Sequence, residues 1–193
     1  MWGNSKNFKT RSYNATMRQS DNLKINMEKV EINKNMKLSE HFVLGELTKT
    51  SHKTKDGNIP SHVAIENLKR ICVNWLEDLR YSYNTLYCLN PGEDYETSKD
   101  VEGIVINSGY RSPAVNKAAG GAATSNHLTG CAVDIRCAGK EQMIRYASIL
   151  LDIADGTKQE YDELLLEQHG TTCWLHFAVR PKDNRRRIAF IKA

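Results

Sequence analysis

The chain has 193 residues, and it lacks both long apolar runs and a regular cysteine pattern. None of its apolar runs approaches the roughly 18–20 residues that a membrane-spanning helix needs. Its five cysteines are an odd number without regular spacing, which argues against a disulfide framework. We therefore expect a soluble globular domain whose cysteines, such as Cys131 and Cys173, are mostly buried small hydrophobic residues.

The net charge of +4 is unevenly distributed along the chain. Residues 1–37 contain eight Lys or Arg and three Asp or Glu, and the remaining residues are nearly neutral. We interpret residues 1–36 as a basic, flexible arm with one strand near residues 29–32, and residues 37–193 as the folded domain. The arm is either a solvated leader or a contact for an anionic polymer, and we do not expect nucleic acid as a partner.

The pattern of apolar residues predicts helices beside a mainly antiparallel sheet. Ser61 has the character of an N-cap for a long helix whose apolar stripe runs from Ile65 to Tyr83 and packs on the sheet. Ser112 and Pro113 begin a short helix, and a further amphipathic helix is expected at residues 140–151. The expected strands are residues 104–106, 131–136, 161–167, 173–179 and 187–192. Helices segregated from such strands define an α+β fold.

The stretch from Asn107 to Arg136 carries the residues with chemical character. His127 lies in a loop before Gly130, and Asp134 lies in the strand that follows. Strand alternation places Asp134 on the polar face of its strand, and it places His176 on the polar face of the strand at 173–179. If these strands are neighbours, three ligands converge and can hold a catalytic zinc with one position open for water. The alternative is a surface Asp and a surface His without a metal.

Several motifs resemble one family of enzymes. They are SGYRS at 108–112, the GGA that follows, SNHLTGCAVDI at 125–135 and WLHFAV at 174–179. Together they are similar to the zinc peptidases of the D-alanyl-D-alanine carboxypeptidase type, whose site plan also occurs in lysostaphin-type enzymes and hedgehog domains. The sequence LSEHFVLGELT at 38–48 resembles phage endolysin-like members, and the whole resemblance covers residues 38–180.

The resemblance implies one zinc ion bound by His127, Asp134 and His176. It also implies a zinc cleft and hydrolysis of peptide bonds in bacterial peptidoglycan, with the stem peptide as substrate. A general base must take a proton from the attacking water, and Glu167 matches the Glu of phage-like members. His169 is the alternative, since some relatives use a His. Many relatives have a carboxylate three residues before the last ligand, where this chain has Cys173.

Three further residues are expected to act on the substrate or on the shape of the site. The family places an Arg at the position of Arg111 to bind a substrate carboxylate in bidentate fashion. The alternative for Arg111 is a structural brace of its loop. Ser125 and Tyr110 are expected either to orient the site or to contact the substrate. The run Arg185–Arg187 is either a polyanion-binding patch or a solvated corner.

The function expected from these observations is a zinc metallopeptidase, in particular a lysis enzyme of a phage or prophage. Residues 1–19 contain no apolar segment typical of a signal peptide. We therefore expect a monomer that accumulates in the cytoplasm until release to the cell wall, or one carried in a virion. The alternatives are a catalytically silent, zinc-bearing module that binds the cell wall, and a structural component of a virion. D-Ala-D-Ala, L-Ala-D-Glu and cross-bridge bonds all remain open as the bond that is cut.

Overall fold

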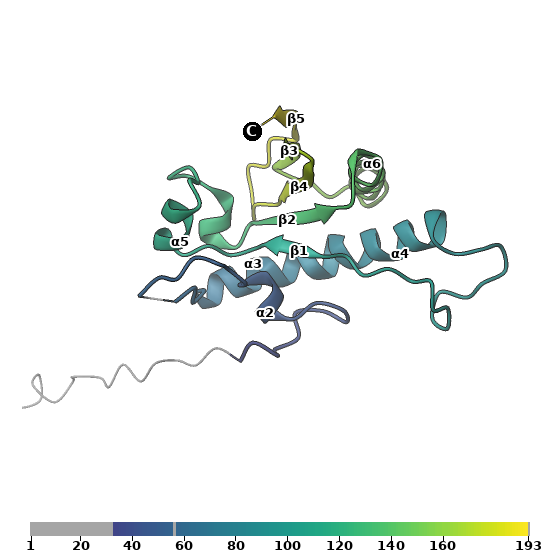
Figure 1. The fold of residues 1–193 in the computed structure, drawn as a ribbon, viewed down its shortest axis with the longest axis horizontal. Helices are drawn as coiled ribbons and strands as arrows, with labels where there is room; N and C mark the ends of the chain where they lie inside the picture. Colours follow the sequence, from purple (N-terminus) through teal and green to yellow (C-terminus); the bar gives the residue numbers. More distant parts are fainter. Residues whose placement is uncertain (1–32, 56, 193) are drawn as a thin grey trace, which may run out of the picture. The chain divides into compact units, whose positions relative to one another are not determined.

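A five-stranded sheet organises the domain in the computed structural model, which describes residues 33–55 and 57–192 (Figure 1). Its strands are β1 (Ile106–Ser108), β2 (Ala132–Cys137), β3 (Glu163–His169), β4 (Thr172–Ala178) and β5 (Arg187–Lys192). Their order is β1-β2-β4-β3-β5, and only the β3–β5 pair is parallel. The α+β prediction with a mainly antiparallel sheet is therefore confirmed. The strand expected near residues 29–32 lies outside the described residues.

Two helix starts that the sequence predicts are confirmed by their N-caps. The Ser61 side chain accepts a hydrogen bond from the backbone of Ala64, and that of Ser112 accepts one from Val115. The helices are α2 (Leu44–Leu47), α3 (His62–Ile71), a π-helical turn η1 (Cys72–Leu76), α4 (Glu77–Tyr87), α5 (Pro113–Ala118), a 3-10 turn η2 (Asn126–Thr129) and α6 (Lys140–Thr157). No helix among the described residues has the length and apolar content needed to cross a membrane.

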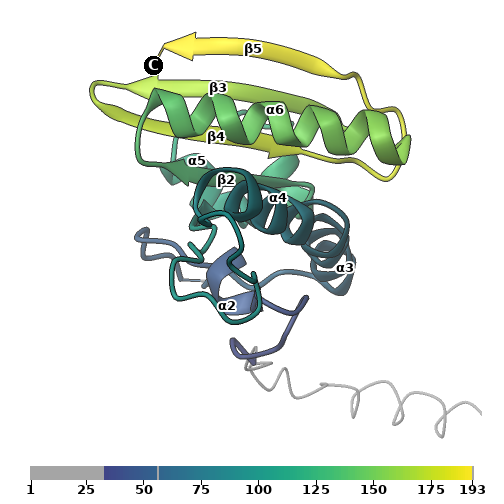
Figure 2. The same cartoon turned by 90° about the vertical axis from the view of Figure 1, so that its right-hand side faces the viewer.

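One face of the sheet packs against helices. Figure 2 shows α6 running across β3 and β4. From η1, the Trp75 ring lies 5.0 Å from the ring of Phe177 on β4, and Tyr83 of α4 contacts Tyr146 of α6 edge-on at 4.7 Å. Phe177 and, by alternation, Leu175 and Cys173 of β4 point to this face. Cys131 and Cys173 are buried as expected. The opposite face carries Asp134 and His176, together with the buried Leu165 that pairs with His176.

Two predicted boundaries around residues 84–106 were wrong. The helix continues to Tyr87, although a loop was expected from residue 84. The buried side chain of Asn84 accepts a hydrogen bond from the Glu102 amide and donates one to the Glu102 carbonyl. These bonds hold the returning chain against α4, so that β1 begins at Ile106 and not at residue 104.

Gly130 is the position where we expect a single methyl group to disturb the fold most. Its φ is +70°, and a Cβ there would lie 2.3 Å from the carbonyl oxygen of Ala64 on α3. We expect Gly130→Ala to lower the free energy of unfolding in urea by more than the roughly 1–3 kcal/mol of backbone strain alone. Gly92→Ala is the control, because Gly92 has a φ of +91° but a Cβ added there would meet nothing within 4 Å. Equal losses in the two variants would contradict this packing argument.

Candidate metal centre

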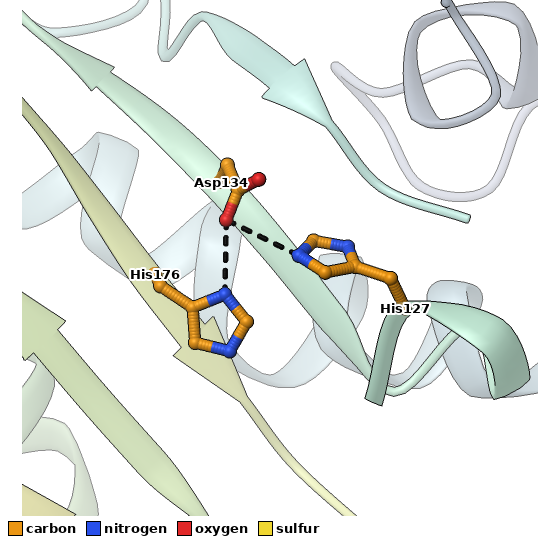
Figure 3. Close-up of side chains that lie close together, drawn as sticks. All are labelled: His127, Asp134 and His176. Carbon is orange, nitrogen blue, oxygen red and sulfur yellow. Dashed lines mark hydrogen bonds and ion pairs between the residues drawn. The ribbon is translucent and has the colours of Figure 1, made fainter. Parts of the chain in front are cut away.

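The register of β2 and β4 places Asp134 directly opposite His176. The Oδ1 atom of Asp134 lies 2.9 Å from Nδ1 of His176 and 3.2 Å from Nε2 of His127 (Figure 3). One ligand atom from each residue lies within 4.8 Å of the other two. The structure therefore brings together the three residues that the sequence predicts as metal ligands. Two imidazole nitrogens and a carboxylate oxygen are a donor set that suits zinc.

The loop that carries SGYRS fixes the orientation of His127. The ring nitrogen Nδ1 of His127 lies 2.5 Å from the carbonyl oxygen of Gly109, so Nδ1 carries the proton and Nε2 is free to bind a metal. The Arg111 amide donates to the His127 carbonyl at 3.0 Å, and the Tyr110 amide donates to Leu47 at 2.7 Å. A Cβ at Gly109 would lie 2.4 Å from the carbonyl oxygen of Leu47, so this close approach requires glycine.

Arg111 and Ser125 both support ligands in this structure. A guanidinium nitrogen of Arg111 pairs with Oδ2 of Asp134, and its Nε donates to the Ser108 hydroxyl at 2.8 Å. The Ser125 hydroxyl accepts the amide proton of His127 at 3.3 Å, at the start of η2. Burial alone would raise the pKa of Asp134, but the two neighbouring histidines hold this pKa well below its ordinary value. Asp134 is therefore charged, as a carboxylate that binds a metal must be.

Glu163 is a component of the site that the sequence analysis missed. Its Oε2 atom lies 3.6 Å from Nε2 of His176, which is an ion-pair contact too long for a hydrogen bond. The same oxygen accepts a hydrogen bond from the Asn126 side chain at 3.1 Å, and Oε1 pairs with Arg187 at 2.8 Å. The interaction with His176 and the nearby arginines lower the pKa of Glu163 to about 2, despite partial burial. Glu163 is thus a permanent negative charge behind His176.

The arginine run 185–187 is exposed, as a solvated corner would be, but each of its side chains pairs with an acidic residue. Arg185 makes two side-chain hydrogen bonds to the fully buried carboxylate of Asp162, at 2.8 and 2.7 Å. Arg186 pairs with Asp155, and Arg187 pairs with Glu163. Local periodicity could not find these partners, because they come from α6, from β3 and from Asp162 just before β3. The run anchors the start of β5 beside the metal centre.

The predicted base candidates lie on β3 at different distances from the centre. Leu165 pairs with His176, Glu167 pairs with Trp174, and His169 pairs with Thr172. On the same face of β3, Glu167 is therefore the next residue along from the position that pairs with His176, and His169 is the one after that. Burial raises the pKa of Glu167, although the positive charge of His176 opposes this shift. Tyr110 is only 8% exposed.

The three ligand side chains are buried, although they lie on the polar side of the sheet. Asp134 and His176 point away from the apolar face, as alternation predicts. The exposed fractions are 2% for His127, 6% for Asp134 and 9% for His176. The loop at 108–112 and the turn η2 converge on Asp134 through Arg111 and His127, and they cover this end of the sheet.

Zinc affinity is expected to rise with pH. Burial lowers the pKa of His176, but Asp134 and Glu163 outweigh burial and raise it from 6.5 to about 9. A metal at Nδ1 must displace this proton, so affinity should rise about tenfold per pH unit and level off near pH 9. In the metal-free protein the same shift stabilises the fold below pH 6.5, and this contribution is lost as the pH rises through about 9.

A chromophoric chelator in competition with the protein, at fixed pH values between 6 and 10, measures this dependence. Glu163→Gln removes one of the carboxylates that raise the pKa of His176, so its plateau should begin at a lower pH. A zinc affinity that does not change between pH 6.5 and 9 would contradict the assignment of His176 as a protonated ligand.

An α+β domain with a buried His-Asp-His cluster of this geometry is a candidate metal-dependent enzyme. The model of the family Peptidase M15 matches residues 40–161, which is more than half of the chain. The chain therefore belongs to the Peptidase M15 family. The matched range contains His127 and Asp134, and the third ligand, His176, follows it in the sequence. A comparison with curated proteins finds no match.

Proposed function

We propose that this protein is a zinc-dependent peptidase that hydrolyses peptide bonds in bacterial peptidoglycan. The observation that carries the proposal is the His127–Asp134–His176 cluster in a member of the Peptidase M15 family. When bound there, zinc would supply a Lewis acid that polarises the scissile carbonyl and lowers the pKa of a water molecule. Three protein ligands leave a further coordination position for water and substrate.

Glu167 is our candidate for the general base. It lies on the same sheet face as His176, one pleat step away, and burial raises its pKa toward the range useful for proton transfer. The carboxylate would take the proton of the attacking water and return it to the leaving amine. His169 lies a further pleat step away, which favours Glu167.

Arg111, Ser125 and Tyr110 are proposed to hold the ligands in place. Arg111 already pairs with Asp134 and Ser108, so its guanidinium acts as a brace for the carboxylate ligand. Ser125 fixes the turn that presents His127. The burial of Tyr110 and its backbone bond to Leu47 favour a role in securing the loop.

The experiment that tests this function combines zinc content with product analysis on purified peptidoglycan. We expect about one zinc per chain and release of muropeptides, whose masses identify the bond that is cut. Removal of zinc with a chelator should stop release, and added zinc should restore it. Zinc-loaded protein that binds the wall but releases no product would support a silent binding module and contradict the peptidase.

We further propose that this hydrolysis serves lysis of the host cell by a phage. The support is the resemblance of residues 38–48 to phage endolysins, a segment in which Phe42, Leu44 and Leu47 are fully packed into the core. Production of the protein in a bacterium followed by permeabilisation of the inner membrane should cause lysis. A culture that stays intact under these conditions, while the purified protein digests its peptidoglycan, would contradict the lytic role.

A further inference from the structure

Arg136 lies beside the metal centre on the same face of the sheet. It follows Asp134 by two residues on β2, so the two side chains point to the same side, about 7 Å apart along the strand. Arg136 pairs across the ladder with Trp174, and Trp174 pairs in turn with Glu167. Glu167, Trp174 and Arg136 therefore lie side by side on three adjacent strands, next to the cross-strand set that contains His176 and Asp134.

The guanidinium of Arg136 is unpaired within the described part of the chain. The guanidinium of every other described arginine has a partner, which is a backbone carbonyl for Arg70 and a side chain for the rest: Arg80, Arg111, Arg145, Arg180, Arg185, Arg186 and Arg187. Arg136 is exposed, and its backbone amide donates a hydrogen bond to the carbonyl of Val105. An unpaired cation beside a candidate active site is available to bind a ligand.

A cavity of about 410 Å³ opens at this position. It is lined by Asn107, Arg136, Cys137, Ala138, Thr171 and Thr172. Its volume lies in the range of small-molecule sites. Besides the guanidinium, the Asn107 amide and the two threonine hydroxyls can donate hydrogen bonds, and no acidic side chain lines the cavity. This lining suits an anionic group such as a carboxylate.

We propose that Arg136 and this cavity form a subsite for a carboxylate of the substrate peptide. The proposal rests on the peptidase function proposed above. Because Arg136 is two residues from Asp134 on the same face of β2, a carboxylate held by Arg136 would belong to a substrate residue close to the scissile bond. In a stem peptide two sources have this chemistry, the α-carboxylate of D-Glu and the C-terminal carboxylate.

Arg111 is the other arginine near the centre, and the structure assigns it a different role. Its guanidinium is engaged by Asp134 and Ser108, and its side chain is 18% exposed. If Arg111 bound the substrate carboxylate instead, it would have to give up its pairing with a metal ligand. Arg136 can bind a carboxylate without breaking any contact in the described structure.

Calorimetric titration of zinc-loaded protein with synthetic peptides tests the subsite. The background is Glu167→Gln, so that the peptides stay intact. The probes are L-Ala-γ-D-Glu-L-Lys-D-Ala-D-Ala and two analogues, one with the D-Glu α-carboxylate as an amide and one with a C-terminal amide. We expect one of the amides to bind roughly 10–100-fold more weakly than the parent peptide, and its identity names the source of the carboxylate.

Substitution of Arg136 provides the second arm. Arg136→Ala should weaken binding of the parent peptide by the same factor and leave binding of the weaker-binding amide unchanged. Arg136→Lys should keep part of the difference in affinity between these two peptides. Arg145→Ala on α6 is the matched control and should change nothing. Equal weakening of all peptides by Arg136→Ala, no weakening of any, or no binding of the parent peptide would overturn the subsite. Cleavage of the parent peptide by protein that retains Glu167 tests the peptidase function separately.

Discussion

Replacement of Glu167 by Gln is expected to lower kcat on a soluble muropeptide by about 10²–10⁴-fold, with zinc content unchanged. The amide is close in size to the carboxylate but cannot accept the proton of the attacking water. In the wild type, kcat/KM should fall as the pH falls through the pKa of Glu167, because protonation removes the base. The variant should lack this decline on the acid side.

Glu141→Gln is the matched control for this substitution, because Glu141 is a highly exposed carboxylate on α6. It should retain full activity. If Glu167→Gln keeps the wild-type kcat, Glu167 is not the base, and His169→Ala becomes the next variant to measure. Loss of zinc along with activity would show that Glu167 supports the ligands and does not transfer the proton.

Replacement of Asp134 by Ala is expected to abolish both zinc binding and peptidase activity. It removes one ligand, and it leaves His127, His176 and Arg111 without their shared carboxylate in a buried site. Removal of one partner from a buried ion pair costs roughly 3–5 kcal/mol. At pH 6, where His176 is protonated, urea unfolding with chelator present should show a loss of this size.

Asp152→Ala is the control for the loss of an acidic side chain, since Asp152 is exposed on α6. It should keep one zinc and wild-type stability. An Asp134→Ala protein that still binds one zinc with wild-type affinity would exclude Asp134 as a ligand.

Much of this fold could be predicted from local patterns. Alternation along two short strands placed Asp134 and His176 on the face opposite the apolar side chains, and the observed register puts them directly across from each other. The caps at Ser61 and Ser112 were predictable because a hydroxyl before a helical stripe satisfies free amide groups. These features depend on residues that are close together in the chain.

The missed features depend on contacts between distant segments. Glu163 and Asp162 are ordinary acidic residues at the start of an apolar strand, and their roles arise only when β5 pairs in parallel with β3 and brings Arg185 and Arg187 beside them. The burial of the ligands depends in the same way on the approach of the 108–112 loop to Leu47. No local pattern encodes either contact.

The pairing of β2 with β4 also sets the order in which the centre can assemble during folding. β3 and β4 form a local hairpin, whereas Asp134 and His176 are 42 residues apart in the chain. Closing the long loop between them costs more chain entropy than closing the short turn of the hairpin. We therefore expect the three ligands to come together only when β4 pairs with β2, after the hairpin has formed. Zinc should accordingly slow unfolding much more than it accelerates refolding.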